Sequence, residues 1–282
     1  METGDDSVAT AHSAASGDST RKVEPIRIST KGDLPVRDPC EVAIETPLTV
    51  TIEEVGSFIV MCTPCDPEAL AVGFAFTEGM IAGFDDIADL ASVREPLTVV
   101  LELNDPGEPG DQRNLIVTSS CGLCGHRDVK KLLEGMSPCG ESLKMSGDML
   151  AEAARNMQAR QGLFERTGGT HAAGILSVQG ELIAFGEDIG RHNALDKAIG
   201  RCILSKRPTE GCGVVLSGRV SVELVVKAVR AGIEIIGAVS APSSLAIDAA
   251  RRCNITLCCF VRDTRATVYT HPRRIVGLEE LA

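Results

Sequence analysis

Strand-like and helix-like segments alternate through the last third of this chain, and this alternation constrains the fold more than any other feature. We expect strands at 213–217, 233–239 and 255–261 and helices at 193–204, 221–231 and 243–253. Such alternation indicates βαβ units, in which helices cover both faces of a sheet. The sequence therefore predicts an α/β fold with a larger, three-layer αβα domain at the C-terminal end. A helix at 148–161 and a β-hairpin at 171–186, turning at Gln179-Gly180, precede this region.

The first part of the chain has a different pattern, typical of an α+β arrangement. Residues 41–62 divide into short β segments, and a helix begins at Pro67 with Asp66 as its N-cap. Two more strands are expected at 97–103 and 113–119. This pattern predicts a smaller N-terminal domain.

The turn-rich segment "NDPGEPGDQ" lies between these last two strands and is where we place the domain boundary. The N-terminal segment is rich in Ser, Ala, Gly, Thr and Asp, a composition typical of disorder. The predicted division is a disordered tail over 1–24, a small α+β domain over 25–110 and an α/β domain over 111–282.

Charge and cysteine content exclude several classes of function. The net charge of −11 argues against general nucleic-acid binding, which requires a basic face. The N-terminus does not resemble a secretory signal, and no apolar run reaches the roughly 18 residues of a membrane helix. Eleven cysteines in a chain of this length are typical of a reducing compartment. We expect a cytoplasmic protein that binds neither membranes nor nucleic acid.

Cys121 and Cys124 form a Cys-x-x-Cys motif between glycines, in "SSCGLCG". Zinc would need two more ligands, and the second such pair, Cys62 and Cys65, is farther away in sequence than in a zinc ribbon. A disulfide oxidoreductase would use the same spacing, but thioredoxin-like domains are much shorter than this chain. A persulfide-carrying thiol or two plain surface thiols also fit. The spacing alone does not choose among these interpretations.

Polar turns follow the predicted strands one after another, in "GEDIGRHNALDK" (186–197), "SGRVS" (217–221), "SAPSS" (240–244) and "FVRDTR" (260–265). If the strands run in one direction, all four turns lie at one edge of the sheet. Helix N-termini at such an edge attract phosphate, and arginines add bidentate donors. The sequence therefore predicts an anion pocket lined by Arg191, Arg219, Arg262 and Arg265.

Individual residues near these turns have simple expected roles. Asn193 and Ser221 are the expected N-caps of the helices that follow. Asp196 and Lys197 are expected on the exposed side of their helix, where charged side chains remain hydrated.

With these residues identified, the chain resembles the FdhD family, the accessory sulfurtransferases of molybdenum-dependent formate dehydrogenases. The resemblance covers the chain from about residue 41 to the C-terminus. It rests on the blocks "TPCDPEALAVGFAFTEGMI", "SSCGLCG", "FERTGGTHAAG", "GEDIGRHNALDKAIG", "LSGRVSVELVVKA", "VSAPSSLAIDAA" and "FVRDTRATVYTHPRRI", in this order.

The resemblance implies a sulfur relay. A cysteine desulfurase would donate persulfide sulfur to Cys121, with Cys124 as a second thiol, and the acceptor would be the molybdenum cofactor bis(molybdopterin guanine dinucleotide). The recipient of the sulfurated cofactor would be the formate dehydrogenase apoenzyme. The expected cofactor-binding residues are Phe260, Val261, Arg262, Asp263, Thr264, Arg265, Arg191, His192, Asn193, Ser217, Gly218 and Arg219.

The resemblance also implies a cytidine-deaminase-like sheet in the larger domain, a homodimer and no permanently bound metal ion. Cys62 and Cys65 form a second pair that is not a general feature of the family. Because Cys65 lies just before the expected helix start, its better interpretation is local and structural, and a resolving or donor-docking thiol is the alternative. A cofactor-insertion chaperone that moves no sulfur is the main alternative function. A zinc-dependent nucleotide hydrolase is a more distant one.

Overall fold

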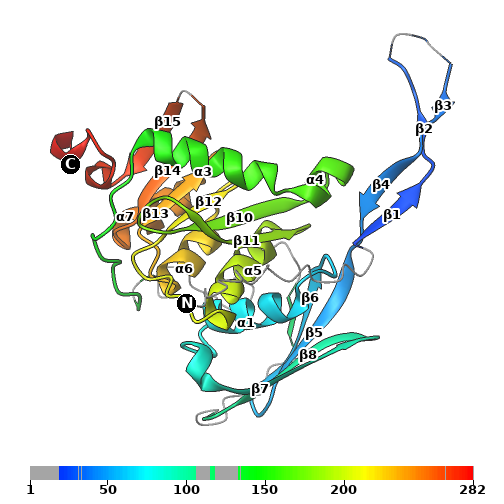
Figure 1. Cartoon of the computed structure of the whole chain (residues 1–282), viewed down its shortest axis with the longest axis horizontal. Coiled ribbons are helices and arrows are strands. Elements are labelled where there is room, and N and C mark those ends of the chain that lie inside the picture. The colour runs from blue at the N-terminus through cyan, green and yellow to red at the C-terminus, as the bar shows by residue number, and fades with distance from the viewer. Residues whose placement is uncertain are drawn as a thin grey trace, which may run out of the picture.

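The computed structural model describes residues 19–30, 32, 34–105, 133, 135–263 and 265–281, together with the backbone of 115–117. Two sheets and the helices that pack on them form most of the described chain (Figure 1). Within the described residues, no helix is long and apolar enough to cross a membrane.

The larger sheet has six strands in the order β11-β10-β12-β13-β14-β15. Their bounds are β10 His171–Leu176, β11 Leu182–Asp188, β12 Gly213–Leu216, β13 Ile235–Ala238, β14 Thr256–Arg262 and β15 Arg265–Thr270. The central strands β12, β13 and β14 are parallel, whereas β10, β11 and β15 pair antiparallel with their neighbours. The predicted hairpin at 171–186 is confirmed as β10 and β11, with Gly180 in the left-handed region that its turn requires (φ 80°).

Strand direction decides where the polar turns lie. Because β11 and β12 are both antiparallel to β10, they run in the same direction, and β13 and β14 continue it. The carboxyl ends of these four strands therefore lie at one edge of the sheet, as predicted. Since β10 runs the opposite way, its first residue, His171, lies at this edge too.

Helices cover both faces of this sheet (Figure 1). Helix α3 (Gly147–Ala159) packs on one face with Leu176, Val215 and Cys258. Helices α5 (Arg191–Leu204), α6 (Val222–Arg230) and α7 (Ser244–Arg252) contribute to the core on the other face. The short helix α4 (Gly162–Thr167) leads from α3 to β10.

The smaller sheet has five strands in the order β7-β8-β5-β6-β9. Their bounds are β5 Thr46–Ile52, β6 Gly56–Cys62, β7 Ile87–Arg94, β8 Leu97–Leu103 and β9 Leu115–Val117. Helix α1 (Pro67–Thr77) begins at Pro67 after Asp66, as predicted. The Asp66 carboxylate does not cap the helix; it pairs with Arg201 of α5 at 2.6 Å.

A narrow ribbon extends away from the rest of the molecule at the N-terminal end (Figure 1). It consists of β1 (Thr20–Val23) paired with β4 (Cys40–Ala43) and of β2 (Ile26–Arg27) paired with β3 (Val36–Arg37). Residues 20–23 were predicted to belong to the disordered tail. Pairing with β4 supplies the backbone hydrogen bonds that make them a strand.

The two sheets are joined where α1 crosses α5. A Cβ added at Gly73 would overlap the carbonyl oxygen of Asp196, and one added at Gly200 would overlap that of Ala69. The helices therefore meet backbone to backbone, and side chains from both sheets belong to one hydrophobic cluster. The division into domains near residue 110 remains a prediction.

Candidate functional site

The polar turns at the carboxyl edge lead into three helices. Helix α5 follows β11 with Gly190 as its N-cap, so the prediction of Asn193 was wrong. The Asn193 amide instead donates to Asp188 Oδ1 at 2.9 Å and to the Met61 carbonyl at 2.8 Å, which hold it inside the helix. Ser221 is the N-cap residue of α6, as predicted, and Ser243 caps α7 by accepting from the Ala246 amide.

A group of basic and polar residues lies at the ends of β10, β11 and β12. His171 Nδ1 is 3.5 Å from Ser217 Oγ, and Ser217 Oγ also accepts a hydrogen bond from the Ala172 amide at 2.8 Å. Gly218 lies against the His171 ring and near the Cβ of Arg191, and an added side chain there would crowd the ring. The structure thus brings together three predicted residues, Arg191, Ser217 and Gly218, and adds His171.

Arg191 and Arg219 also act on His171 through their charges. Burial and the charges of these two guanidinium groups lower the pKa of His171 below 6.5, and Asp188 opposes them. His171 is therefore neutral near pH 7. Among the residues that the structure describes, no carboxylate lies within ion-pair distance of Arg191 or Arg219. In addition, Arg191 Nε is buried and has no hydrogen-bond partner within the described part of the chain. An anion at this edge would provide the missing acceptor.

His192, another predicted ligand residue, lies in the first turn of α5. Its side chain is almost fully buried, and Nε2 lies 3.1 Å from Ser221 Oγ and 3.2 Å from Glu223 Oε2. Both partners face the same ring nitrogen, so the three residues do not form a relay in which a histidine bridges a nucleophile and a carboxylate. The contacts tie the start of α5 to the start of α6.

The β14–β15 end of the same edge contains the other predicted ligand residues. Arg262 and Arg265 are paired across the turn and are both exposed. Asp263 forms an ion pair with Arg155 of α3 at 2.9 Å, and Val261 is buried in the core beneath the turn. Phe260 has a left-handed backbone (φ 54°), and its amide donates to the Ser240 carbonyl, which links this turn to the one after β13.

Three predicted residues lie outside the described residues: Cys121, Cys124 and Thr264. The structure therefore tests neither the thiol motif nor the middle of the β14–β15 turn.

Asp196 and Lys197 were predicted to be exposed, but both are buried, at 2% and 0% exposure. Lys197 Nζ pairs with Asp188 Oδ2 at 2.6 Å and also donates to the Thr63 and Glu187 carbonyls. Burial alone would lower the pKa of Lys197, but the charge and hydrogen bond of Asp188, together with the nearby Cys65 and Cys62, raise that pKa on balance.

Asp196 has a matching arrangement on the other side of α5. It pairs with the buried Lys227 of α6 at 2.9 Å and accepts from the Thr77 hydroxyl at 2.7 Å. These ion pairs join α5 to both of its neighbours. They are buried because α5 is enclosed on all sides, which the spacing of apolar residues did not reveal.

Cys65 contacts the Lys197 group, with Sγ 3.4 Å from Nζ. Cys62 is completely buried, and burial followed by the Asp188 charge raises the pKa of its thiol to about 12. Such a thiol remains protonated and unreactive at neutral pH. This agrees with a structural role for Cys62.

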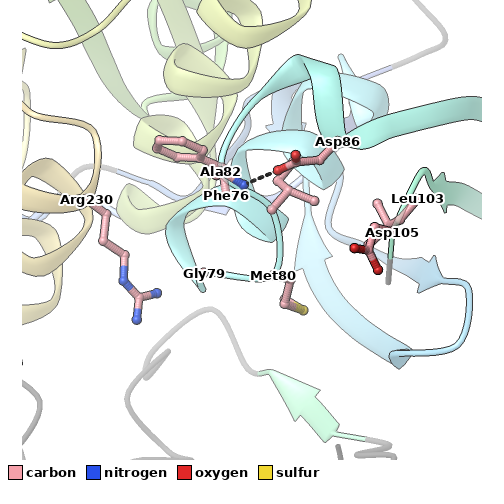
Figure 2. Close-up of a pocket in the computed structure, with 9 residues that line it drawn as sticks. Phe76, Gly79, Met80, Ala82, Asp86, Leu103, Asp105 and Arg230 are labelled. Atoms are coloured by element: carbon pink, nitrogen blue, oxygen red, sulfur yellow. Dashed lines mark hydrogen bonds between the residues drawn. The ribbon is translucent and has the colours of Figure 1, made fainter. Parts of the chain in front are cut away.

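A pocket of about 540 Å³ lies elsewhere, beside the C-terminal ends of α1 and α6 (Figure 2). Asp86 and Arg230 are among the residues that line it, but both already stabilise the fold. Asp86 accepts from the Ala82 amide at 2.5 Å, and Arg230 donates to the Thr77 carbonyl. The predicted site residues that the structure describes do not line this pocket.

His171 is the site residue that the sequence analysis missed. The signal was available in the predicted hairpin: its first strand must run opposite to its second, which places the start of the first strand at the edge where the second one ends. His171 is the first residue of the predicted hairpin, but the prediction did not place it at the carboxyl edge.

Comparison with known proteins identifies close relatives. The family model described as FdhD/NarQ family matches residues 43–276. A protein from Thermoplasma acidophilum named Sulfur carrier protein FdhD is 37% identical over 246 residues, covering 83% of this chain and 86% of its own. A protein of the same name from Bordetella parapertussis is 38% identical over 244 residues, with coverages of 84% and 87%.

The fold also matches a solved structure. The crystal structure of a protein described as a formate dehydrogenase accessory protein, from Desulfotalea psychrophila, superposes with a TM-score of 0.74 at 26% identity. The match covers 91% of this chain and 99% of that one.

Proposed function

Because the chain belongs to the FdhD/NarQ family, we propose that it is a sulfur carrier that serves formate dehydrogenase. The names of its relatives support the sulfur-carrying role, and the description of the solved structure supports the link to formate dehydrogenase. The protein would act in the cytoplasm as a homodimer. It would bind neither nucleic acid nor membranes.

The sulfur enters at Cys121 in this proposal. The Cys121 thiolate attacks the terminal sulfur of a persulfide on a cysteine desulfurase, forms Cys121-S-SH and releases the desulfurase thiolate. Attack by Cys124 on the Cys121 sulfur would then form a disulfide and release hydrosulfide to the acceptor. The bonds broken and formed balance without an external oxidant.

The acceptor would be the molybdenum of bis(molybdopterin guanine dinucleotide), bound before its insertion into the formate dehydrogenase apoenzyme. The observation that carries this part is the carboxyl edge, where Arg191 and Arg219 lie beside His171 without a carboxylate partner among the described residues. A ligand with two pyrophosphates supplies the negative charge that such an edge lacks. Arg262 and Arg265 would bind at the other end of the same edge.

The test is intact-protein mass spectrometry after incubation with a cysteine desulfurase and cysteine. We expect one or more added sulfur atoms on the wild type, lost on reduction and absent in Cys121→Ala. Cys124→Ala separates the two roles of the second thiol, since full sulfur delivery by this variant would exclude resolution by Cys124. Cys40→Ala, which changes an exposed thiol on the ribbon, is the matched control and should acquire sulfur like the wild type.

If the wild type acquires no sulfur from an active desulfurase, the carrier proposal is wrong. Restoration of formate dehydrogenase activity by Cys121→Ala would then identify a chaperone that inserts the cofactor without moving sulfur. The carboxyl edge would serve either function.

A further inference from the structure

The side chain of His171 is not needed to hold its strand in the sheet. It is half-buried at the start of β10, and the hydrogen bonds that hold β10 in the sheet are made by backbone groups. The hydroxyl Oγ of Ser217 lies at the long distance of 3.5 Å from His171 Nδ1. Ser217 already accepts from the Ala172 amide, so its own position does not depend on His171.

The charged groups around His171 come from three elements. Arg191 lies at the start of α5, Arg219 follows β12, and Asp188 ends β11. The Asp188 carboxylate is already engaged by Lys197 at 2.6 Å and by the Gly190 amide at 2.8 Å. The imidazole therefore faces two guanidinium groups that have no carboxylate partner among the described residues.

We propose that His171 is a further anion-binding residue of this edge, and that it takes up a proton when an anion binds between it, Arg191 and Arg219. This inference rests on the proposed function in one respect, namely that the edge holds a phosphate-bearing ligand. It goes further by assigning a ligand contact to a residue outside the predicted set and by coupling binding to pH.

The physical reason is the change in local charge. In the free protein, burial and the two guanidinium groups keep the imidazole neutral by lowering its pKa. An anion bound between the arginines offsets their repulsion and offers acceptor oxygens, both of which favour the protonated ring. A buffer acid supplies the proton to a ring nitrogen, and the imidazolium N–H donates to an oxygen of the anion.

The other histidines with described positions do not share this environment. His192 is almost fully buried, with Nε2 facing Ser221 and Glu223. His271 lies beyond the end of β15, at the opposite edge of the sheet, where Nε2 is 2.8 Å from the Arg251 carbonyl oxygen. His271 is therefore a matched control.

The experiment is titration calorimetry with GDP-mannose, at about pH 6.5, in two buffers that differ in ionisation enthalpy. This probe is a pyrophosphate diester and stays fully ionised from about pH 6 to 8, unlike a terminal phosphate, whose second pKa is about 6. Any proton taken up then belongs to the protein. The wild type, His171→Gln, His271→Gln and Arg219→Ala are compared.

For the wild type we expect uptake of up to one proton on binding and an affinity several-fold higher at pH 6 than at pH 8, since a one-unit rise in pKa is worth at most about tenfold. His171→Gln should bind without proton uptake and with an affinity that does not vary over this range. His271→Gln should behave as the wild type.

Two results would contradict the inference, and only the second would also contradict the cofactor part of the proposed function. Binding by the wild type without proton uptake, unchanged in His171→Gln but weakened in Arg219→Ala, would overturn the role of His171 and leave the anion site in place. No binding by the wild type, or equal binding by Arg219→Ala, would remove the anion site and with it the cofactor part of the proposed function. The persulfide measurement tests the sulfur-carrying part independently.

Discussion

Replacement of Lys197 by methionine tests whether the buried ion pair behind the edge stabilises the fold. Methionine keeps most of the length and volume of the lysine stem but removes the charge. The change leaves the Asp188 carboxylate at 0% exposure without its cationic partner. Asp188 would keep hydrogen bonds from the Thr63 amide at 3.0 Å, the Thr63 hydroxyl at 2.9 Å, the Gly190 amide at 2.8 Å and the Asn193 amide at 2.9 Å.

These remaining donors decide the magnitude. Removing one partner of a buried ion pair costs about 3–5 kcal/mol. We expect Lys197→Met to lie near the lower value, about 3 kcal/mol, because four donors still stabilise the carboxylate. Asp188→Asn should lie near the upper value, about 5 kcal/mol, because it leaves a buried ammonium facing only neutral acceptors and places an amide NH₂ among donors.

The assay is urea unfolding followed by far-ultraviolet circular dichroism, since the chain has no tryptophan and one tyrosine and gives little intrinsic fluorescence. The double variant should be more stable than the sum of the single losses predicts, by about 2 kcal/mol, because the two residues interact directly. Lys22→Met on the exposed ribbon is the control and should change stability by less than about 0.5 kcal/mol. A cost below about 1 kcal/mol for Lys197→Met, or a larger cost for it than for Asp188→Asn, would refute this reasoning.

Three further predictions concern the helix crossing and the edge. Gly73→Ala should destabilise the protein by about 1–3 kcal/mol or more, the cost of overpacking, because its methyl group would overlap the Asp196 carbonyl. Urea unfolding measures this change, and an unchanged free energy of unfolding would mean that the two helices can move apart freely. The stability of the wild type should fall as pH drops below about 6.5, because the folded state disfavours protonated His171 while the unfolded state binds the proton. His171→Gln should make this fall less steep, and an identical pH profile of the two proteins would contradict the role of burial. Arg262→Ala should weaken binding of GDP-mannose by roughly 1.5–3 kcal/mol, as expected for loss of a charged hydrogen bond, and an unchanged dissociation constant would move the ligand away from this turn.

The sequence was informative where local chemistry and chain direction decide the structure. The expected strands at 97–103 and 213–217 correspond to β8 and β12, and the common edge of four strands follows from short connections between alternating elements. Gly180 provided the hairpin turn for the same local reason.

The sequence was less informative where a charge pairs with a distant residue. Lys197 and Asp196 looked like a solvated helix face because charged side chains are usually exposed. Their partners are Asp188, from β11, Thr63, from the β6–α1 connection, and Lys227, from α6. A local sequence pattern does not predict such ion pairs, because each one depends on how three separate elements pack together.

The same limit explains the position of Asn193. Its residue type favoured Asn193 as an N-cap, but the N-cap is Gly190, three residues earlier. Arg191 and His192 already belong to the helix. Its amide is used instead to bind Asp188 and the end of β6.

The crossing of α1 and α5 fixes how the two sheets are placed relative to each other. At Gly73 and Gly200 the spacing between the helices is fixed by main-chain atoms, which have no rotamers to exchange. The separation of the two sheets therefore has a backbone reference point that does not loosen when side chains reorient with temperature. The residues of the two sheets therefore keep their relative alignment as long as the α1–α5 crossing is preserved. A methyl group added at Gly73 or Gly200 would push the helices apart, and the resulting displacement would grow with distance along both sheets.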